Sequence, residues 1–204
     1  MQILKDKVVP YKNKWINVHL NAIDNRKDFY LYVTLHNENG NIYNNIGLLG
    51  IKYERNGFWK IVDFEINRQY RGQNYGLAMF SEALTGIRLL NTEKEVYVYG
   101  EIPNLYIDDR NQYQTIAESK DYCKLKNFYQ NINFEFINDK KFYKQVSVTS
   151  ISEWQSNIQK VMEIKDLKIE IAFKDIILES YEKEMSDIKA SLLGRYVIKR
   201  VENK

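Results

Sequence analysis

The sequence predicts an α/β (α+β) fold: a mixed, mostly antiparallel sheet with flanking helices, followed by a long C-terminal helix. Three observations lead to this prediction. The first third of the chain alternates apolar and polar residues with the period of two that half-buried strands show. Two later segments space their apolar residues by three and four, as amphipathic helices do. The last part of the chain has a helical pattern and lacks Pro.

Four segments predict an antiparallel meander at the start of the sheet. They are rich in alternating, β-branched and aromatic residues and cover 15–23, 29–35, 42–53 and 58–66. The dipeptides Asn39-Gly40 and Asn56-Gly57 are strong hairpin signals and separate the last three segments. Only Asp24–Asp28 links the first two, which leaves no room for a helix between them.

The apolar spacing then changes to that of a helix. It predicts a helix over 75–90, a buried strand over 95–102, a second helix over 120–131, a closing hairpin over 134–148 and a final helix over 152–193. A strand, a helix and a strand in succession form a crossover, so the strands at 58–66 and 95–102 should be parallel neighbours.

Composition bounds the classes of protein. With 204 residues, 44% of them apolar, the chain can bury a core. Its 30 basic and 27 acidic residues nearly balance, so a nucleic-acid partner is not expected. A single Cys suits a reducing compartment, and we expect a cytoplasmic protein. No apolar run approaches the ~20 residues that cross a bilayer. One Cys and two His cannot complete a zinc site without carboxylates, so no metal is expected.

The junction over 64–80 carries the chemistry. A strand ends at Ile66, a polar loop follows, and a helix begins. Helix N-termini present unpaired N–H groups and the positive end of the helix dipole, which suit phosphate. Gly72 and Gly76 would let phosphates approach the backbone, and Arg71 adds positive charge. By chemistry alone this is an anion cradle. The alternative is an ordinary strand-to-helix turn in which the glycines only satisfy the geometry.

Within this junction, Arg71-Gly72-Gln73-Asn74-Tyr75-Gly76 resembles the acetyl-CoA signature Arg/Gln-x-x-Gly-x-Gly/Ala of the GNAT superfamily of N-acetyltransferases. Asn74 stands where the first glycine of that signature is usual. Residues 129–134 are similar to the family's Tyr-x-x-x-Gly-Phe element, with Asn133 in place of glycine, and 99–104 resembles the end of its fifth strand. Together these matches cover about residues 15–148.

The resemblance implies a GNAT-like sheet that splays after Ile66 and near Glu101. The pantetheine arm of acetyl-CoA would lie in the split, with its pyrophosphate on the N–H groups of Gln73 to Gly76. The cofactor-binding residues implied in this way are Phe64, Ile66, Arg71, Gly72, Gln73, Asn74, Tyr75, Gly76 and Asn104.

The resemblance also implies an acetyl-CoA-dependent N-acetyltransferase that moves the acetyl group directly from the thioester to a primary amine of an unidentified acceptor. Tyr129 matches the family's general acid and would protonate the departing thiolate, although its place on an apolar helical stripe is also compatible with a core role. Glu101 is the candidate base, with a solvated strand-end carboxylate as the alternative. Asp63 and Glu65 would point away from a cleft lined by the Ile66 side of the strand.

A catalytically silent binding module on the same fold is the alternative function. Its partner would be a protein, or RNA stacked on the aromatic strand 29–32. The substitutions Asn74 and Asn133 support this alternative, whereas the balanced charge argues against RNA.

The sequence divides into a GNAT-like acyltransferase domain over 1–150 and a C-terminal helical extension over 151–204. Apolar residues in the extension keep a four-three spacing over about four heptads, with Lys174 as the only exception. They are Ile164, Leu167, Ile171, Leu178, Tyr181, Met185, Ile188 and Leu192. Such a coiled-coil stripe must pack on something. We expect a homodimer, or packing of this helix on the domain. In the second case the helix would supply the acceptor-site wall that GNAT proteins usually build from helices between their first two strands.

Overall fold

The computed structural model describes residues 7–22, 29–37, 45–103 and 119–191. The chain forms two compact units, 1–162 and 163–204. The first unit holds the sheet and is described here. Within the second unit, the described residues continue the last helix.

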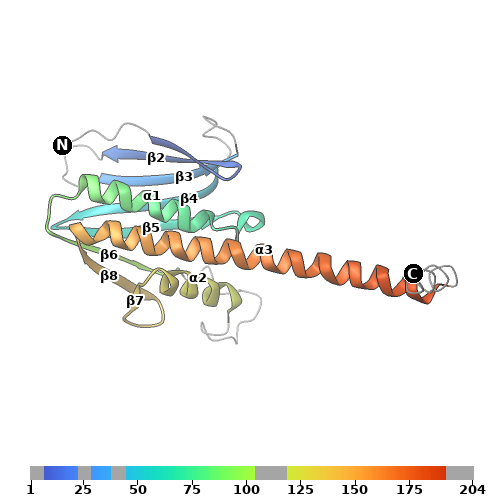
Figure 1. The fold of residues 1–204 in the computed structure, drawn as a ribbon. Helices are drawn as coiled ribbons and strands as arrows, with labels where there is room; N and C mark the ends of the chain where they lie inside the picture. Colours follow the sequence, from blue (N-terminus) through green and yellow to red (C-terminus); the bar gives the residue numbers. More distant parts are fainter. Residues whose placement is uncertain (1–6, 23–28, 38–44, 104–118, 192–204) are drawn as a thin grey trace. The chain divides into compact units, whose positions relative to one another are not determined.

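One sheet organises the first unit, and its topology confirms the predicted fold class. The strands follow the order β1-β2-β3-β4-β5-β6-β8-β7, and every neighbouring pair is antiparallel except β5 and β6, which are parallel. Their bounds are β1 Lys7–Tyr11, β2 Lys14–Ala22, β3 Phe29–His36, β4 Asn45–Arg55, β5 Phe58–Ile66, β6 Glu95–Glu101, β7 Glu135–Phe136 and β8 Lys141–Ser147 (Figure 1).

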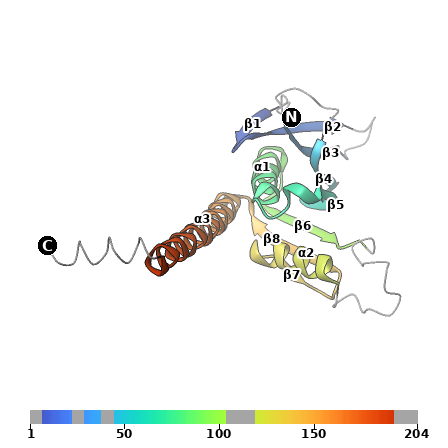
Figure 2. The same cartoon turned by 90° about the vertical axis from the view of Figure 1, so that its right-hand side faces the viewer.

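Among the described residues, three α-helices accompany the sheet: α1 Tyr75–Leu90, α2 Lys120–Asn131 and α3 Ile151–Ala190. Helix α1 connects β5 to β6, so the predicted crossover between parallel neighbours is confirmed. It lies against the sheet, as the view turned by 90° shows (Figure 2). The Asn39-Gly40 turn lies outside the described residues, whereas Asn56-Gly57 joins β4 to β5 as predicted.

Helices α1 and α2 and the start of α3 pack on one face of the sheet. The ring of Phe80 on α1 makes edge contacts with Trp154 of α3 at 5.6 Å and with Phe134 at 5.7 Å between ring centroids. Phe134 in turn lies 5.4 Å from the ring of Tyr129 on α2. This face also buries the apolar residues of alternate strand positions, among them Leu31, Val33, Leu49, Ile51, Val96 and Val98. The period-two pattern predicts this apolar face, although Thr34 and His36, at the alternate positions of β3, are buried as well.

The sheet splits between its two parallel strands. Residues Phe58–Lys60 pair with Tyr97–Tyr99, and beyond that point β5 continues to Ile66 without a partner strand on the β6 side among the described residues. The split therefore opens earlier than the strand ends, where the resemblance placed it. The cause lies in β5 itself, where Val62 is an extra residue in the pairing with β4. Such a bulge bends and twists its strand away from a neighbour.

Strand β1 was not predicted from the sequence. It is short and contains Pro10, which lacks an N–H for a ladder and is tolerated because β1 is an edge strand. Its turn into β2 places Lys12 in the left-handed region, with φ of 54°.

The beginning of α3 belongs to the core of the first unit. Its Ile151, Trp154 and Ile158 are buried. Gln155 Nε2 donates to the carbonyl of Ser81 and to Oγ1 of Thr85, each at 2.8 Å. These contacts place residues 151–162 on the face of the sheet that α1 covers. This part of the helix therefore cannot form an acceptor-site wall on the other face of the sheet.

We predict that the chain tolerates truncation after Met162 but not after Ser150. The shorter chain loses three buried side chains, and removing a buried Ile or Trp side chain costs about 2–5 kcal/mol. A chain of 162 residues keeps all of them. Thermal unfolding followed by circular dichroism should show a cooperative transition for the longer fragment and none for the shorter. Equal midpoints for both would contradict this placement of α3.

Candidate functional site

The loop between β5 and α1 has a shape that only some residues adopt. Its φ angles are 81° at Gly72 and 67° at Asn74, both left-handed. Glycine adopts this region freely, and Asn enters it more readily than other residues with a side chain. The same holds at Asn133, the other position where the resemblance expects glycine, with φ of 65°. Both substitutions therefore preserve the backbone that glycine would give.

The N-terminus of α1 faces a loop with basic side chains. The first turn of the helix holds no acidic residue, and Asn74 does not cap it with its side chain. Arg71 Nε donates to the carbonyl of Ile66 at 2.8 Å, which holds the guanidinium against the end of β5. Lys12 Nζ donates to the carbonyl of Gln73 at 3.2 Å and adds a second cation. Lys12 was not predicted from the sequence, because 61 positions separate it from Gln73.

The two residues that open α1, Tyr75 and Gly76, both serve the packing of the helix. Tyr75 is buried, and its hydroxyl donates to Oδ1 of Asn13 at 2.8 Å. A Cβ on Gly76 would lie 3.0 Å from Cζ of Phe64 and 3.1 Å from Cδ1 of Ile66. The glycine therefore permits the close approach of α1 to β5, rather than an open path for a ligand as expected. Both residues still offer backbone N–H groups to an anion. Asn104 lies outside the described residues.

Tyr129 lies between the two diverging strands on the helical face. Its ring stacks on Phe142 with 3.8 Å between centroids, and the ring of Phe64 on β5 is 6.2 Å away. Phe142 lies beside β6, because its ring would touch a Cβ on Gly100. Tyr129 is 3% exposed. Its position beside both strands is compatible with the acid role and with the core role.

The opposite face of the split carries the carboxylates. Glu101 follows Tyr97 and Tyr99 in the strand alternation, away from buried Val96 and Val98. Asp63 pairs with Gly50, and a Cβ on Gly50 would lie 3.4 Å from Cβ of Asp63. Asp63 and, by alternation, Glu65 therefore point to the face of the sheet to which Glu101 points.

All three carboxylates point to the same face of the sheet, so this criterion does not favour Glu101 over Asp63 or Glu65 as the base. At the point where the split opens, the hydroxyl of Tyr99 donates to the carboxylate of Glu54. Burial and this bond raise the pKa of Tyr99 to about 12, so it stays protonated at neutral pH.

The aromatic strand 29–32 does not form one platform. Tyr30 and Tyr32 stack at 5.7 Å, and Tyr32 stacks on His19 at 5.5 Å. Phe29 stacks instead on Tyr53 of the helical face. Strand alternation sends neighbouring side chains to opposite faces, so only half of the expected surface exists.

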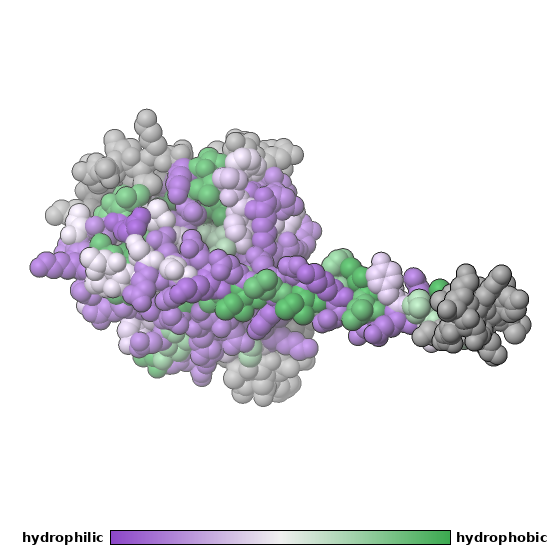
Figure 3. All heavy atoms as spheres, viewed as in Figure 1, coloured by the Kyte–Doolittle hydropathy of each residue, from purple (hydrophilic) through white to green (hydrophobic). Residues whose placement is uncertain are grey.

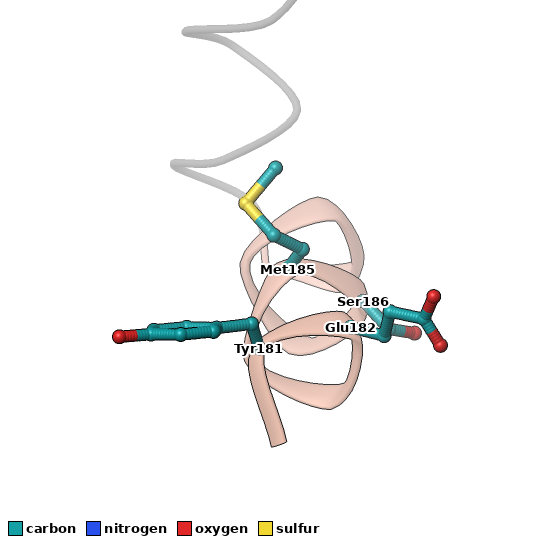
Figure 4. Close-up of a pocket in the computed structure, with 4 residues that line it drawn as sticks. All are labelled: Tyr181, Glu182, Met185 and Ser186. Carbon is teal, nitrogen blue, oxygen red and sulfur yellow. The ribbon is translucent and has the colours of Figure 1, made fainter. Parts of the chain in front are cut away.

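Other candidate sites carry little chemistry. A pocket on α3 is lined by Tyr181, Glu182, Met185 and Ser186, and Figure 4 shows Tyr181 and Glu182 pointing to opposite sides of the helix. Within the described ranges, His, Cys, Asp and Glu side chains do not gather in groups of three or more that could hold a metal ion. None of the described helices has the length and hydropathy to span a membrane.

Comparisons with known proteins find similarity in structure. No family model and no curated protein match the chain. A GNAT-family acetyltransferase from Staphylococcus aureus Mu50 is 14% identical, with a TM-score of 0.41 over 57% of this chain and 67% of that one. An aminoglycoside 6'-N-acetyltransferase complexed with coenzyme A is 10% identical, with a TM-score of 0.38 over 58% and 73%. A KacTA–DNA complex is 12% identical, with a TM-score of 0.41 over 63% and 74%.

We predict that Gly76→Ala lowers the free energy of unfolding by about 1–3 kcal/mol, the usual cost of overpacking. The added Cβ would lie 3.0 Å from the ring of Phe64. In a Phe64→Leu background the same substitution should cost less, because the clashing ring atom is gone. Urea denaturation of the four proteins in this double-mutant cycle measures the coupling. Additive costs would show that Gly76 is not held by contact with Phe64.

Proposed function

We propose that this chain is an acetyl-CoA-dependent N-acetyltransferase that acetylates a primary amine. The proposal rests on the position of two features next to each other: the split in the sheet and the N-terminus of α1. The strand that borders the split, β5, ends in the loop that forms the N-terminus of α1. A gap between strands and an anion cradle at its mouth are the two sites that a long molecule with a phosphate end and a thioester end needs.

The cofactor would bind along β5. Its pyrophosphate would accept hydrogen bonds from the N–H groups of Gln73 to Gly76, with Arg71 and Lys12 supplying positive charge. Its pantetheine amides would pair with the backbone of β5 beyond Lys60, which lacks a partner strand on that side among the described residues. For this pairing the side chain of Arg71 must release the carbonyl of Ile66.

The chemistry needs groups on both faces of the split. The amine nitrogen attacks the thioester carbon, the carbonyl oxygen becomes an oxyanion, and the carbon–sulfur bond then breaks. Backbone N–H groups near the Val62 bulge are suited to stabilise the oxyanion. Tyr129, on the helical face, would give its proton to the thiolate. Glu101, on the opposite face, would take the proton of the amine through water, and Asp63 is an equal candidate by direction. Acid and base on different faces would let one group serve the sulfur and the other the nitrogen, which are separate substituents of the tetrahedral carbon.

A catalytically silent binding module is the second candidate. The stacked row of His19, Tyr32 and Tyr30 favours it. The substitutions Asn74 and Asn133 no longer do, because both keep the left-handed backbone. Binding of single-stranded RNA that weakens with salt, in a protein that does not bind CoA, would favour this module. A cytoplasmic location remains part of the proposal.

We predict that Tyr129→Phe lowers kcat at least about 100-fold while the affinity for acetyl-CoA stays within about twofold, because the ring remains and only the acidic proton is lost. Release of free thiol in the presence of a panel of primary amines measures turnover. Tyr122→Phe is the matched control, because it removes the hydroxyl of another buried tyrosine on the same helix. Equal rates for the two variants would contradict the acid role.

We also propose that α3 pairs with a second copy of the chain. The described seam residues are each 52–62% exposed: Ile164, Leu167, Ile171, Leu178, Tyr181, Met185 and Ile188. Figure 3 shows hydrophobic residues at the surface along this helix. Lys174, the one charged seam residue, forms an ion pair with Glu170 at 2.7 Å. Leu192 lies outside the described residues.

We predict that Leu178→Glu converts a dimer into a monomer, because it places a charge in the seam of each copy. Ile176→Glu is the control: Ile176 is 64% exposed on the same helix but lies outside the seam. Sedimentation equilibrium gives the mass of each protein. A monomeric unaltered protein, or equal effects of both substitutions, would exclude pairing through this seam.

A further inference from the structure

The side chain of Asn74 links the loop to a distant part of the chain. Its Nδ2 donates to the backbone carbonyl of Met162 on α3 at 3.0 Å, across 88 positions of sequence. Asn74 is 6% exposed. Its backbone stands in the left-handed conformation immediately before α1. A glycine there would give the same backbone but could not make this bond.

The bond is the last of a series between α1 and α3. Arg88, near the end of α1, donates to Oγ of Ser152 at the start of α3 at 2.7 Å. Gln155 reaches Ser81 and Thr85 farther back along α1. Residue numbers fall along one helix as they rise along the other, so the two helices run antiparallel. The carbonyl of Met162 therefore arrives at the N-terminal end of α1, beside the loop.

We propose that Asn74 is a positioning residue for the cofactor, which rests on the proposed function. Its bond to Met162 holds the loop so that the N–H groups of Gln73 to Gly76 keep one direction before a pyrophosphate arrives. A loop that is already ordered loses less conformational entropy on binding. The end of the α3 segment that belongs to the first unit is then part of the cofactor site through the backbone carbonyl of Met162.

The link also works in the opposite direction. If the bond to Met162 favours cofactor binding, the bound cofactor must strengthen that bond by the same free energy. Amides of α3 around Met162 should therefore exchange with solvent more slowly when acetyl-CoA is bound. This turn is also where the first compact unit ends and the second begins.

Calorimetry of the full-length protein with two ligands tests the proposal. Acetyl-CoA carries the pyrophosphate, whereas acetyl-pantetheine keeps the thioester and lacks it. Asn74→Gly should weaken acetyl-CoA binding about three- to tenfold, the range that one hydrogen bond supplies, and leave acetyl-pantetheine binding unchanged. Gln155→Ala is the control, because it removes another bond between α1 and α3 but not the one at the loop; it should lower stability without changing either affinity.

The outcomes separate the two levels of proposal. Equal affinity of the unaltered protein and Asn74→Gly for acetyl-CoA would overturn the role of Asn74 and leave the proposed function standing. Weakening of both ligands by both variants would indicate a general loss of structure and would also overturn it. An unaltered protein that binds neither ligand would remove the proposed function and this inference with it. Hydrogen exchange of the unaltered protein gives an independent check: unchanged rates around Met162 on addition of acetyl-CoA would refute the link.

Discussion

The end of pairing between β5 and β6 is the constraint on which the rest of the first unit depends. Beyond Lys60 the β6-facing edge of β5 has no strand beside it in the described chain, and backbone N–H and C=O groups are costly to bury without partners. One of these carbonyls, that of Ile66, accepts a hydrogen bond from Arg71. Aromatic rings, those of Tyr129 and Phe142, lie beside the two strands on the helical face. A ligand with amides of its own would suit the backbone edge that remains.

The bulge at Val62 connects this constraint to the sequence. Antiparallel pairing holds β2 to β5 side by side, and the turn at Asn56-Gly57 joins β4 directly to β5. One extra residue then changes the direction of β5. The change separates β5 from β6 while α1 still joins them, which places the N-terminus of that helix at the mouth of the gap.

The sequence predicted the parts of the fold that depend on local periodicity. The helix over 75–90 and the strand over 58–66 agree with the structure because each has one apolar face and clear turn signals at its ends. Strand β1 was missed because five residues that include Pro10 carry no usable period. The early opening of the split was missed although the sequence holds a trace of the bulge: the apolar residues of this strand change from odd positions, Trp59 and Ile61, to even ones, Phe64 and Ile66, on either side of Val62.

The candidate site was predictable only where local geometry decided it. Left-handed positions at Gly72 and Asn74 follow from the motif, because few residues adopt that conformation. The packing role of Gly76, the approach of Lys12 to Gln73 and the bond from Asn74 to Met162 all join residues far apart in the chain. No single-sequence pattern records such contacts. The direction of Glu101 and the failure of the four-residue aromatic platform both follow from alternation within one strand, so the sequence already contained these two results.

The most direct measurement of the central claim, that the split strand and the start of α1 form one cofactor site, is a titration of isotope-labelled protein with acetyl-CoA followed by amide NMR signals. Binding at this site predicts that the signals of 73–76 and of 61–66 shift together, with one dissociation constant. No shift in either segment at millimolar acetyl-CoA, or shifts confined to other parts of the chain, would contradict the claim.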